Sequence, residues 1–341
     1  MKKILPAVFL IVGSIIGAGF ASGRELSLFF AKFGYNSLYF LPIVFILFYY
    51  CFKFFLSLGS KEKFENIFAI NKLSNSSPFF NIAIIAIFFV YSSAMFGGAV
   101  EVLKNNFIEI NSLVFTIFVF LLAFLVLKFG LKGLVRINYF LIPIIVILLV
   151  IYSIYSTIHP ITNIAYIPET KEAYVLPLSI IIYVFGNILL SYFILTEAGK
   201  ELTSKEITKA SFLSALIICF VLFICIMCLI TNGTVVMDAR MPFIVLTLRL
   251  GEPFPIIFML ILFLGIITSL FGCLHTVSKP FQTKLKGLTS FVVCLTVLLI
   301  SLLGFENIVN YCYPVVGAFG LYIVVKLIIF QHQKDKMAHK N

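Results

Sequence analysis

The sequence predicts an all-α integral membrane protein with ten transmembrane helices arranged as a 5+5 inverted repeat. Its 341 residues are 62% hydrophobic and only 11% charged, and the mean hydropathy is +1.13. Because soluble domains carry roughly 25% charged residues, this composition is typical of a polytopic membrane protein. Two further observations support the prediction. Apolar runs of membrane-spanning length recur along the chain, and glycines interrupt the first run of each half.

Runs of about 20 apolar residues mark the expected spans. They cover residues 4–30, 37–58, 79–103, 110–128, 134–157, 174–196, 208–231, 254–277, 287–303 and 308–330. Between the seventh and eighth spans, residues 241–250 are expected to form a short helix outside the membrane core.

The basic residues predict the orientation of these spans. With the N-terminus in the cytoplasm, 19 of the 25 Lys and Arg residues fall on the inner side and 6 on the outer side. Such a positive-inside bias predicts a protein of the cytoplasmic membrane with both termini cytoplasmic. The net charge of +11 therefore needs no nucleic-acid partner.

The polar loop near residues 158–173 divides the ten spans into two sets of five. We expect a first repeat over residues 1–158, a second over 172–331 and a cytoplasmic tail over 332–341, which function as one transmembrane domain. An odd number of spans per half means that the halves insert with opposite orientations, as in many transporters.

The first span is the most informative segment, because small residues interrupt it halfway. In hydrocarbon, a break in a helix leaves backbone groups that protein, water or a bound ion must satisfy. Close packing against another helix is the alternative, since the glycines of this segment have GxxxG spacing. The two GxxxG pairs point to nearly opposite sides of a helix, which one packing face would not require. We therefore expect substrate contacts from Gly17, Ala18, Gly19, Ser22 and Gly23.

The sixth span, which opens the second half, contains Phe185, Gly186 and Asn187 about 12 residues from its start, or roughly 18 Å deep. A second break is expected there, and interruptions at matching positions of two halves indicate a transporter binding site. Tyr91 of the third span is expected to contribute to the wall of the same site.

The eighth span contains two adjacent hydroxyls, Thr268 and Ser269, after Gly265. Hydroxyls in an apolar helix usually bond back to a carbonyl one turn earlier. Hydroxyl and carbonyl oxygens are also hard, neutral ligands that a sodium ion accepts, so both interpretations stand.

The segment from Gly13 to Gly19 resembles the broken first helix of the sodium-coupled transporters with the LeuT fold, and Phe185-Gly186 resembles the unwound part of their sixth helix. The phrase GSIIGAGFASGRE, together with ten spans, is most similar to the YkvI-like membrane proteins of the amino acid–polyamine–organocation superfamily. One departure is Phe20, which stands where that fold typically has an asparagine. The resemblance implies a sodium site formed by the carbonyls of Gly13, Ile16 and Gly265 and the hydroxyls of Thr268 and Ser269.

Charged residues near the outer ends of spans indicate a gate. The resemblance implies that an arginine of the first helix and an acid of the tenth close the outer side, which here are Arg24 and Glu306. Glu101, at the outer end of the third span, is a third candidate. Snorkelling to the lipid headgroups, or a surface pair between Arg24 and Glu25, are the alternatives.

We therefore expect a secondary active transporter of a small organic solute, coupled to sodium. The solute carboxylate would bind the N–H groups of residues 18–23, and its ammonium group the oxygens near residues 185–187. Because no buried acid is expected nearby, a neutral amino acid or related zwitterion fits best. A proton-coupled amino acid or amine transporter and a germination-receptor-like sensing subunit remain alternatives, and the oligomeric state is open.

Catalysis is not expected, because no catalytic set of side chains converges within the spans. No cofactor is expected beyond a coupling sodium ion or proton. The seven cysteines lie in apolar runs and are expected to be packed thiols, including the CxxC pair Cys225 and Cys228. His275 is expected at the cytoplasmic interface, and Glu197 as either an inner gate or a helix cap.

Overall fold

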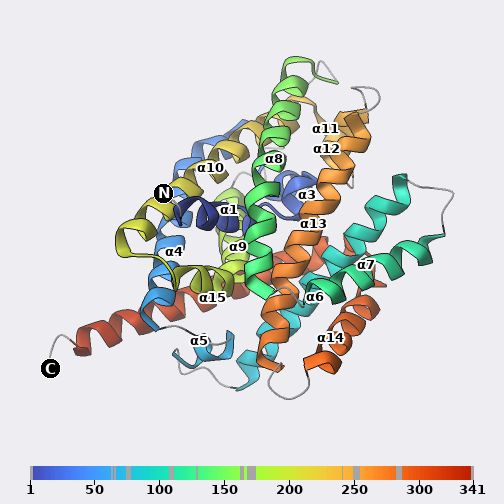
Figure 1. The fold of residues 1–341 in the computed structure, drawn as a ribbon. Coiled ribbons are helices and arrows are strands. Elements are labelled where there is room, and N and C mark those ends of the chain that lie inside the picture. The colour runs from blue at the N-terminus through green and yellow to red at the C-terminus, as the bar shows by residue number, and fades with distance from the viewer. Residues whose placement is uncertain are drawn as a thin grey trace.

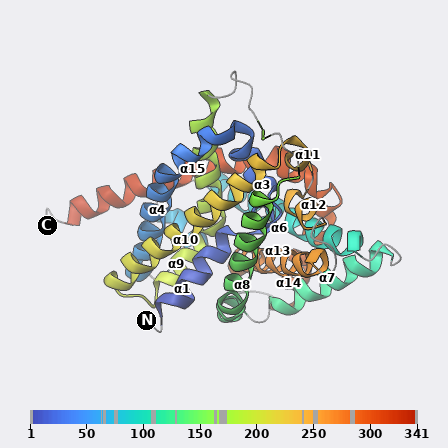
Figure 2. The same cartoon turned by 90° about the horizontal axis from the view of Figure 1, so that it is seen from above.

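The protein is a bundle of long helices, and every regular element in the described part of the chain is helical (Figure 1). The computed structural model describes residues 3–62, 64, 67–73, 78–106, 111–127, 130–161, 165–166, 174–239, 241–248, 254–281 and 286–338. Seen from above, α9 lies within the bundle among α1, α4 and α10 (Figure 2).

The helices follow the expected spans closely. In chain order they are α1 (Ile4–Ile15), α2 (Ala18–Ala21), α3 (Arg24–Phe29), the 3₁₀ helix η1 (Ala31–Phe40), α4 (Leu41–Glu62), α5 (Ile67–Leu73), α6 (Pro78–Asn106), α7 (Ser112–Val126), α8 (Gly130–Ile158), α9 (Leu176–Gly199), α10 (Ser204–Thr231), α11 (Thr234–Met237), α12 (Pro242–Leu248), α13 (Phe254–Ser278), η3 (Lys279–Phe281), α14 (Lys286–Ser301) and α15 (Phe305–Ala338).

Six of these helices are long and apolar enough to cross a membrane, and four more apolar segments of 10–17 residues coincide with the remaining expected spans. The count of ten spans and the boundaries of the two repeats stay predictions. The outer surface supports a bilayer environment. Phe140, Ile144, Ile147 and Ile151 share one face of α8 and are 49–66% exposed. A continuous apolar face of this kind is unusual for a soluble monomer and natural against lipid.

The expected interruption of the first span is confirmed. α1 ends at Ile15, the backbone of Ile16 leaves the helical region (φ −78°, ψ 72°), and α2 begins at Ala18. A second interruption follows at Gly23, whose φ of 84° is readily adopted only by glycine. The small residues of this segment therefore mark real helix ends rather than one packing stripe.

The expected break in the sixth span is wrong for this structure, because α9 is one continuous helix through Phe185, Gly186 and Asn187. The physical reason is packing. A methyl group added at Gly186 would lie 3.2 Å from the Cα of Gly317 on α15, and one added at Gly320 would overlap the carbonyl of Phe185. Glycine in α9 thus lets two helix backbones approach closely, which is its common use in membrane helices.

Candidate functional site

The break between α1 and α2 lies against two other helices. A methyl group added at Gly17 would stand 2.9 Å from the hydroxyl oxygen of Ser269 on α13 and 3.4 Å from that of Tyr91 on α6. Three segments far apart in sequence therefore meet at one glycine. Gly17 and Ser269, expected in the substrate and ion sites respectively, are neighbours, and Tyr91 joins them.

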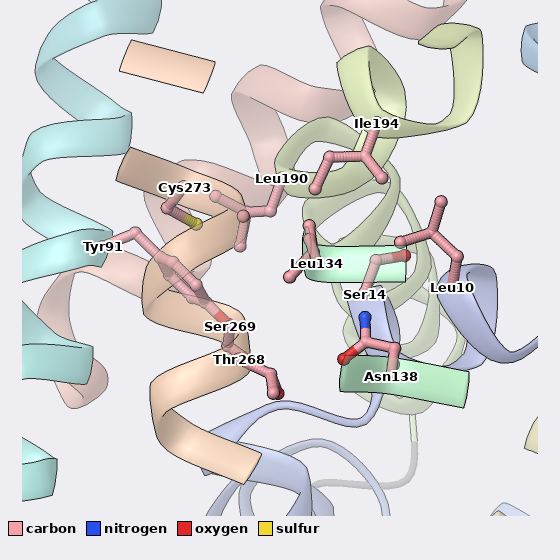
Figure 3. Close-up of a pocket in the computed structure, with 12 residues that line it drawn as sticks. Leu10, Ser14, Tyr91, Leu134, Asn138, Leu190, Ile194, Thr268, Ser269 and Cys273 are labelled. Carbon is pink, nitrogen blue, oxygen red and sulfur yellow. The ribbon is translucent and has the colours of Figure 1, made fainter. Parts of the chain in front are cut away.

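A small cavity of about 20 Å³ lies beside this meeting point (Figure 3). Its lining comes from α1, α6, α8, α9 and α13, and includes the expected site residues Gly13, Tyr91, Thr268 and Ser269. A cavity of this size has room for a water molecule or a small ion but not for an amino acid. The substrate region is therefore closed around an ion-sized space.

The two hydroxyls of α13 both turn toward one carbonyl. Thr268 donates to the oxygen of Gly265 at 2.8 Å, and Ser269 donates to the same oxygen at 3.2 Å. This is the back-bonding that such hydroxyls usually make. It also gathers three oxygen atoms within hydrogen-bond distance, and each hydroxyl oxygen keeps lone pairs that can face a cation.

The end of α1 presents a carbonyl in the same region. In a continuing helix the N–H of Gly17 would donate to Gly13, but here it donates to the oxygen of Ile15 at 2.9 Å. The Gly13 carbonyl thereby loses its regular helical donor. Ile16, the other expected carbonyl ligand of this segment, is fully buried immediately before Gly17.

The segment beyond the break is covered by the short helix α12, which confirms the expected short helix between the seventh and eighth spans. The N–H of Phe243 donates to the oxygen of Ser22 at 3.0 Å, and its ring lies 3.0 Å from where a Gly23 side chain would begin. Ser22 is buried, and its hydroxyl donates to the Gly19 carbonyl at 3.1 Å. On this side the site is sealed by protein.

Glu25 is the main functional candidate that sequence reasoning missed. A surface pair with Arg24 is one of the alternatives that the sequence leaves open, yet Glu25 is only 1% exposed, and a methyl group at Gly19 would overlap its carboxylate. The expectation that no buried acid lies near the site is therefore wrong. The carboxyl group folds back over the segment expected to receive a solute carboxylate, so an acidic side chain already lies there. The available signal was an acidic residue eight positions after Gly17, within the same apolar run.

The corresponding part of α9 faces a second, smaller cavity. Gly186 and Asn187 line it together with Tyr183 and with Phe29 of α3. The side-chain amide of Asn187 donates to the Tyr183 carbonyl at 3.0 Å, and Phe185 is buried. Leu190 lines both this cavity and the one beside Gly17, so the two regions are adjacent.

The expected outer gate is described only in part. The guanidinium of Arg24 donates to the carbonyl of Ala239 at 3.5 Å, and Glu101 is half-buried on α6. Glu306 lies in the first turn of α15, but its side chain is outside the described residues, as is the side chain of Ala18. The gate pair Arg24–Glu306 stays a prediction.

At the opposite end of the bundle a larger hollow of about 720 Å³ opens between α1, α8 and the end of α9. Leu10 lines both this vestibule and the small cavity beside Gly17. The vestibule is bordered by Lys3 and Arg136 and by the acids Glu197 and Glu201. Leu10 is therefore part of the wall of both hollows, so the vestibule approaches the ion-sized cavity at this residue.

Glu197 at the vestibule wall belongs to a buried charge cluster. Its carboxylate contacts the Nε2 of His275 at 3.0 Å and the Nζ of Lys279 at 3.4 Å, with Lys200 at 3.9 Å. Glu197 and His275 are 7% and 8% exposed. The cluster joins α9 to the end of α13, so Glu197 acts as a cross-link between helices and not simply as a cap.

Two curated relatives are similar to this protein along nearly its whole length, although no family model matches it. The membrane protein YkvI of Bacillus subtilis (strain 168) is 23% identical over 344 residues, covering 94% of each chain. The protein YyaD of the same organism is 26% identical over 340 residues, covering 95% of each chain. Both relatives are named as uncharacterised. The resemblance to YkvI that the glycine motif indicated is confirmed.

Solved structures identify the architecture. MhsT in complex with L-phenylalanine superposes with a TM-score of 0.60 at 16% identity, covering 96% of this chain and 88% of MhsT. The protein has the LeuT fold. The nucleobase-cation-symport-1 transporter Mhp1, closed with bromovinylhydantoin bound, gives a TM-score of 0.54 at 14% identity over 90% of this chain and 74% of its own. The inward-facing form of Mhp1 also gives 0.54, at 13% identity over 94% and 75%. Mhp1 is named as a transporter, and MhsT is named as a complex with an amino acid.

Proposed function

We propose that this protein is a secondary active transporter of a small organic solute that carries an amino group, a neutral amino acid or related zwitterion. It works as a sodium symporter by alternating access in the cytoplasmic membrane, with both termini in the cytoplasm. The observation that carries the proposal is the break at Ile16 and Gly17, packed against Tyr91 and Ser269. Broken helices beside polar side chains in a bundle core are typical of transporter binding sites.

The two ends of the site support alternating access. On one side the break is covered by α12, and on the other the vestibule reaches Leu10 at the wall of the small cavity. A site closed toward one side and nearly open toward the other is what one state of such a cycle requires. The basic residues predict that the vestibule side is cytoplasmic.

Proton coupling is a second candidate, and the burial of Glu25 favours it specifically. Ionisable residues inside membrane segments commonly serve proton relays or bind ligands. In the sodium mechanism Glu25 instead faces the ammonium group of the solute. The two mechanisms predict different driving ions for the same site.

Uptake into proteoliposomes tests the proposal. Purified protein is supplied with a panel of radiolabelled amino acids under an inward sodium gradient, an inward proton gradient or neither. We expect saturable uptake of one or a few solutes driven by sodium. Gly17→Leu should abolish it, because any side chain there meets Ser269 and Tyr91. The lipid-facing Ile147→Leu variant is the control.

Uptake driven only by the proton gradient would replace sodium with proton coupling. Saturable binding without uptake under any gradient would indicate a sensing subunit. Unchanged uptake in Gly17→Leu would contradict the assignment of the site.

A further inference from the structure

Asn138 of α8 is a buried polar side chain that the expected site does not include. It is 2% exposed, and in the described part of the chain its side-chain oxygen Oδ1 has no hydrogen-bond partner. An unsatisfied buried acceptor costs about 1–3 kcal/mol. Native proteins rarely leave one without a ligand, an ion or a water molecule. A residue of this kind in a membrane helix therefore indicates a bound species.

The same side chain lines the cavity beside the break. A methyl group at Gly13 would lie 3.0 Å from the Nδ2 of Asn138, so the amide reaches the α1 backbone about one turn before Gly17, beside Ser14. In Figure 3 the Asn138 oxygen lies on the side of the cavity that faces Thr268, while the nitrogen lies on the side of Ser14. The oxygen that lacks a partner thus faces the hydroxyls of α13.

The chemistry of the lining restricts the occupant. The oxygen atoms that could bind a cation belong to an amide, to hydroxyls and to backbone carbonyls. No described lining residue carries a formal charge. Divalent ions such as Ca²⁺ and Mg²⁺ are usually bound with carboxylates. The space of about 20 Å³ exceeds the roughly 10–15 Å³ that one water molecule needs. A monovalent cation fits within this space, and neutral oxygen ligands match its single charge.

We propose that Asn138 Oδ1 is a ligand of a sodium site in this cavity, together with the oxygens of Gly13, Thr268 and Ser269. The inference rests on the sodium coupling proposed above and adds a ligand from α8. The ion then joins three helices, α1, α8 and α13, at the wall that separates the vestibule from the break. Sodium binding holds α8 against α1 and thereby stabilises the closed form of the site.

Thermal unfolding of the full-length protein in detergent tests the assignment. Chloride salts of sodium, potassium and choline are compared at constant ionic strength in wild type and in Asn138→Leu, which replaces the amide by an apolar group of similar size. Wild type is expected to gain stability with sodium only, since an ion that binds only the native state stabilises it. In Asn138→Leu, the sodium concentration that gives half of the maximal stabilisation should be at least tenfold higher than in wild type. Asn138→Asp keeps an oxygen and should retain the shift.

Matched controls keep the result interpretable if a variant is simply less stable. Thr276→Ala removes a buried hydroxyl of α13 that bonds back to Gly272 at 2.9 Å and does not line the cavity, so its sodium shift should match wild type. Thr268→Ala removes the equivalent hydroxyl inside the cavity and should lose the shift. The sodium dependence, not the absolute melting temperature, is the readout.

Each outcome separates the ligand assignment from the proposed function. A sodium shift that Thr268→Ala removes and Asn138→Leu leaves intact would keep sodium coupling and overturn the role of Asn138. Loss of the shift in Asn138→Asp as well as in Asn138→Leu would also overturn it, because the oxygen is retained. Equal stability of wild type in all three salts would mean that the cavity holds only water, and the sodium-site assignment would fail. Solute uptake would still be tested separately by the proteoliposome assay.

Discussion

At the scale of single residues, Glu25 is the acidic side chain that lies beside the broken segment. Its side chain is 1% exposed and lies against the backbone of Gly19, two residues beyond the break. A buried carboxylate is costly unless a partner or ligand offsets its desolvation. Ionisable residues inside membrane segments commonly bind ligands or protons, which makes Glu25 a functional candidate beside the broken helix.

We predict that Gly19→Ala lowers the free energy of unfolding by about 1–3 kcal/mol, because the new methyl group overlaps the Glu25 carboxylate. Adding Glu25→Ala should recover part of the loss. Chemical or thermal unfolding of the two single variants and the double variant measures their coupling. Gly265→Ala is the control, since its methyl group would meet only the flexible end of Ile145, at 3.3 Å. Strictly additive effects of the two changes would contradict the contact.

At the scale of helices, α9 is the element around which the others are arranged. Its most apolar window is 83% buried inside the protein, against 28% for α8. Glycines give it close contacts on two sides: a methyl group at Gly199 would overlap the carbonyl of Leu56 on α4, and one at Gly320 that of Phe185. Glu197 then links the end of α9 to α13 through His275 and Lys279.

We predict that Glu197→Gln destabilises the protein and lowers its melting temperature by several degrees. The buried carboxylate contacts His275 and Lys279, and a hydrogen bond to a charged group contributes about 1.5–3 kcal/mol, so the amide should weaken the link between the helices. The control is Glu201→Gln, since Glu201 lines the same vestibule but is exposed. Equal melting temperatures for the two variants would mean that the cluster does not hold α9 to α13.

At the scale of the whole molecule, the cavities predict from which side of the membrane the site is accessible. The vestibule of about 720 Å³ opens beside the first turns of α1, and Leu10 alone is shared with the inner cavity. The positive-inside bias assigns this end to the cytoplasm. With that predicted orientation, the structure corresponds to a form closed outside and approached from within.

We predict that Ala198→Cys, at the vestibule wall, reacts with a membrane-impermeant maleimide in inside-out vesicles and not in right-side-out vesicles. The variant is made in a background without native cysteines. Ala210→Cys, fully buried on α10, should remain unlabelled in both. Labelling of Ala198→Cys from the outside would reverse the orientation.

Sequence alone predicted most of the architecture. The apolar runs are local properties of the chain, and each expected span coincides with a helix or with the broken series α1–α3. The interruption of the first span was also predictable, because several small residues follow one another there and weaken the helix locally. The positions of Gly13, Thr268 and Ser269 around one cavity followed from resemblance to a known fold.

Only the tertiary structure decided what depends on the neighbouring helix. Gly186 resembles a helix break in sequence, but Gly317 packs against it and the helix continues. In the sequence, Glu25 next to Arg24 is compatible with a surface position, whereas in the structure its carboxyl group packs against Gly19. The His275–Glu197 pair and the position of Asn138 beside Gly13 join residues far apart in the chain. The length of an apolar run and a cluster of small residues act on the local backbone, so the sequence alone predicts their effect. The burial of a polar group depends on packing between residues far apart in the chain, so only the tertiary structure determines it.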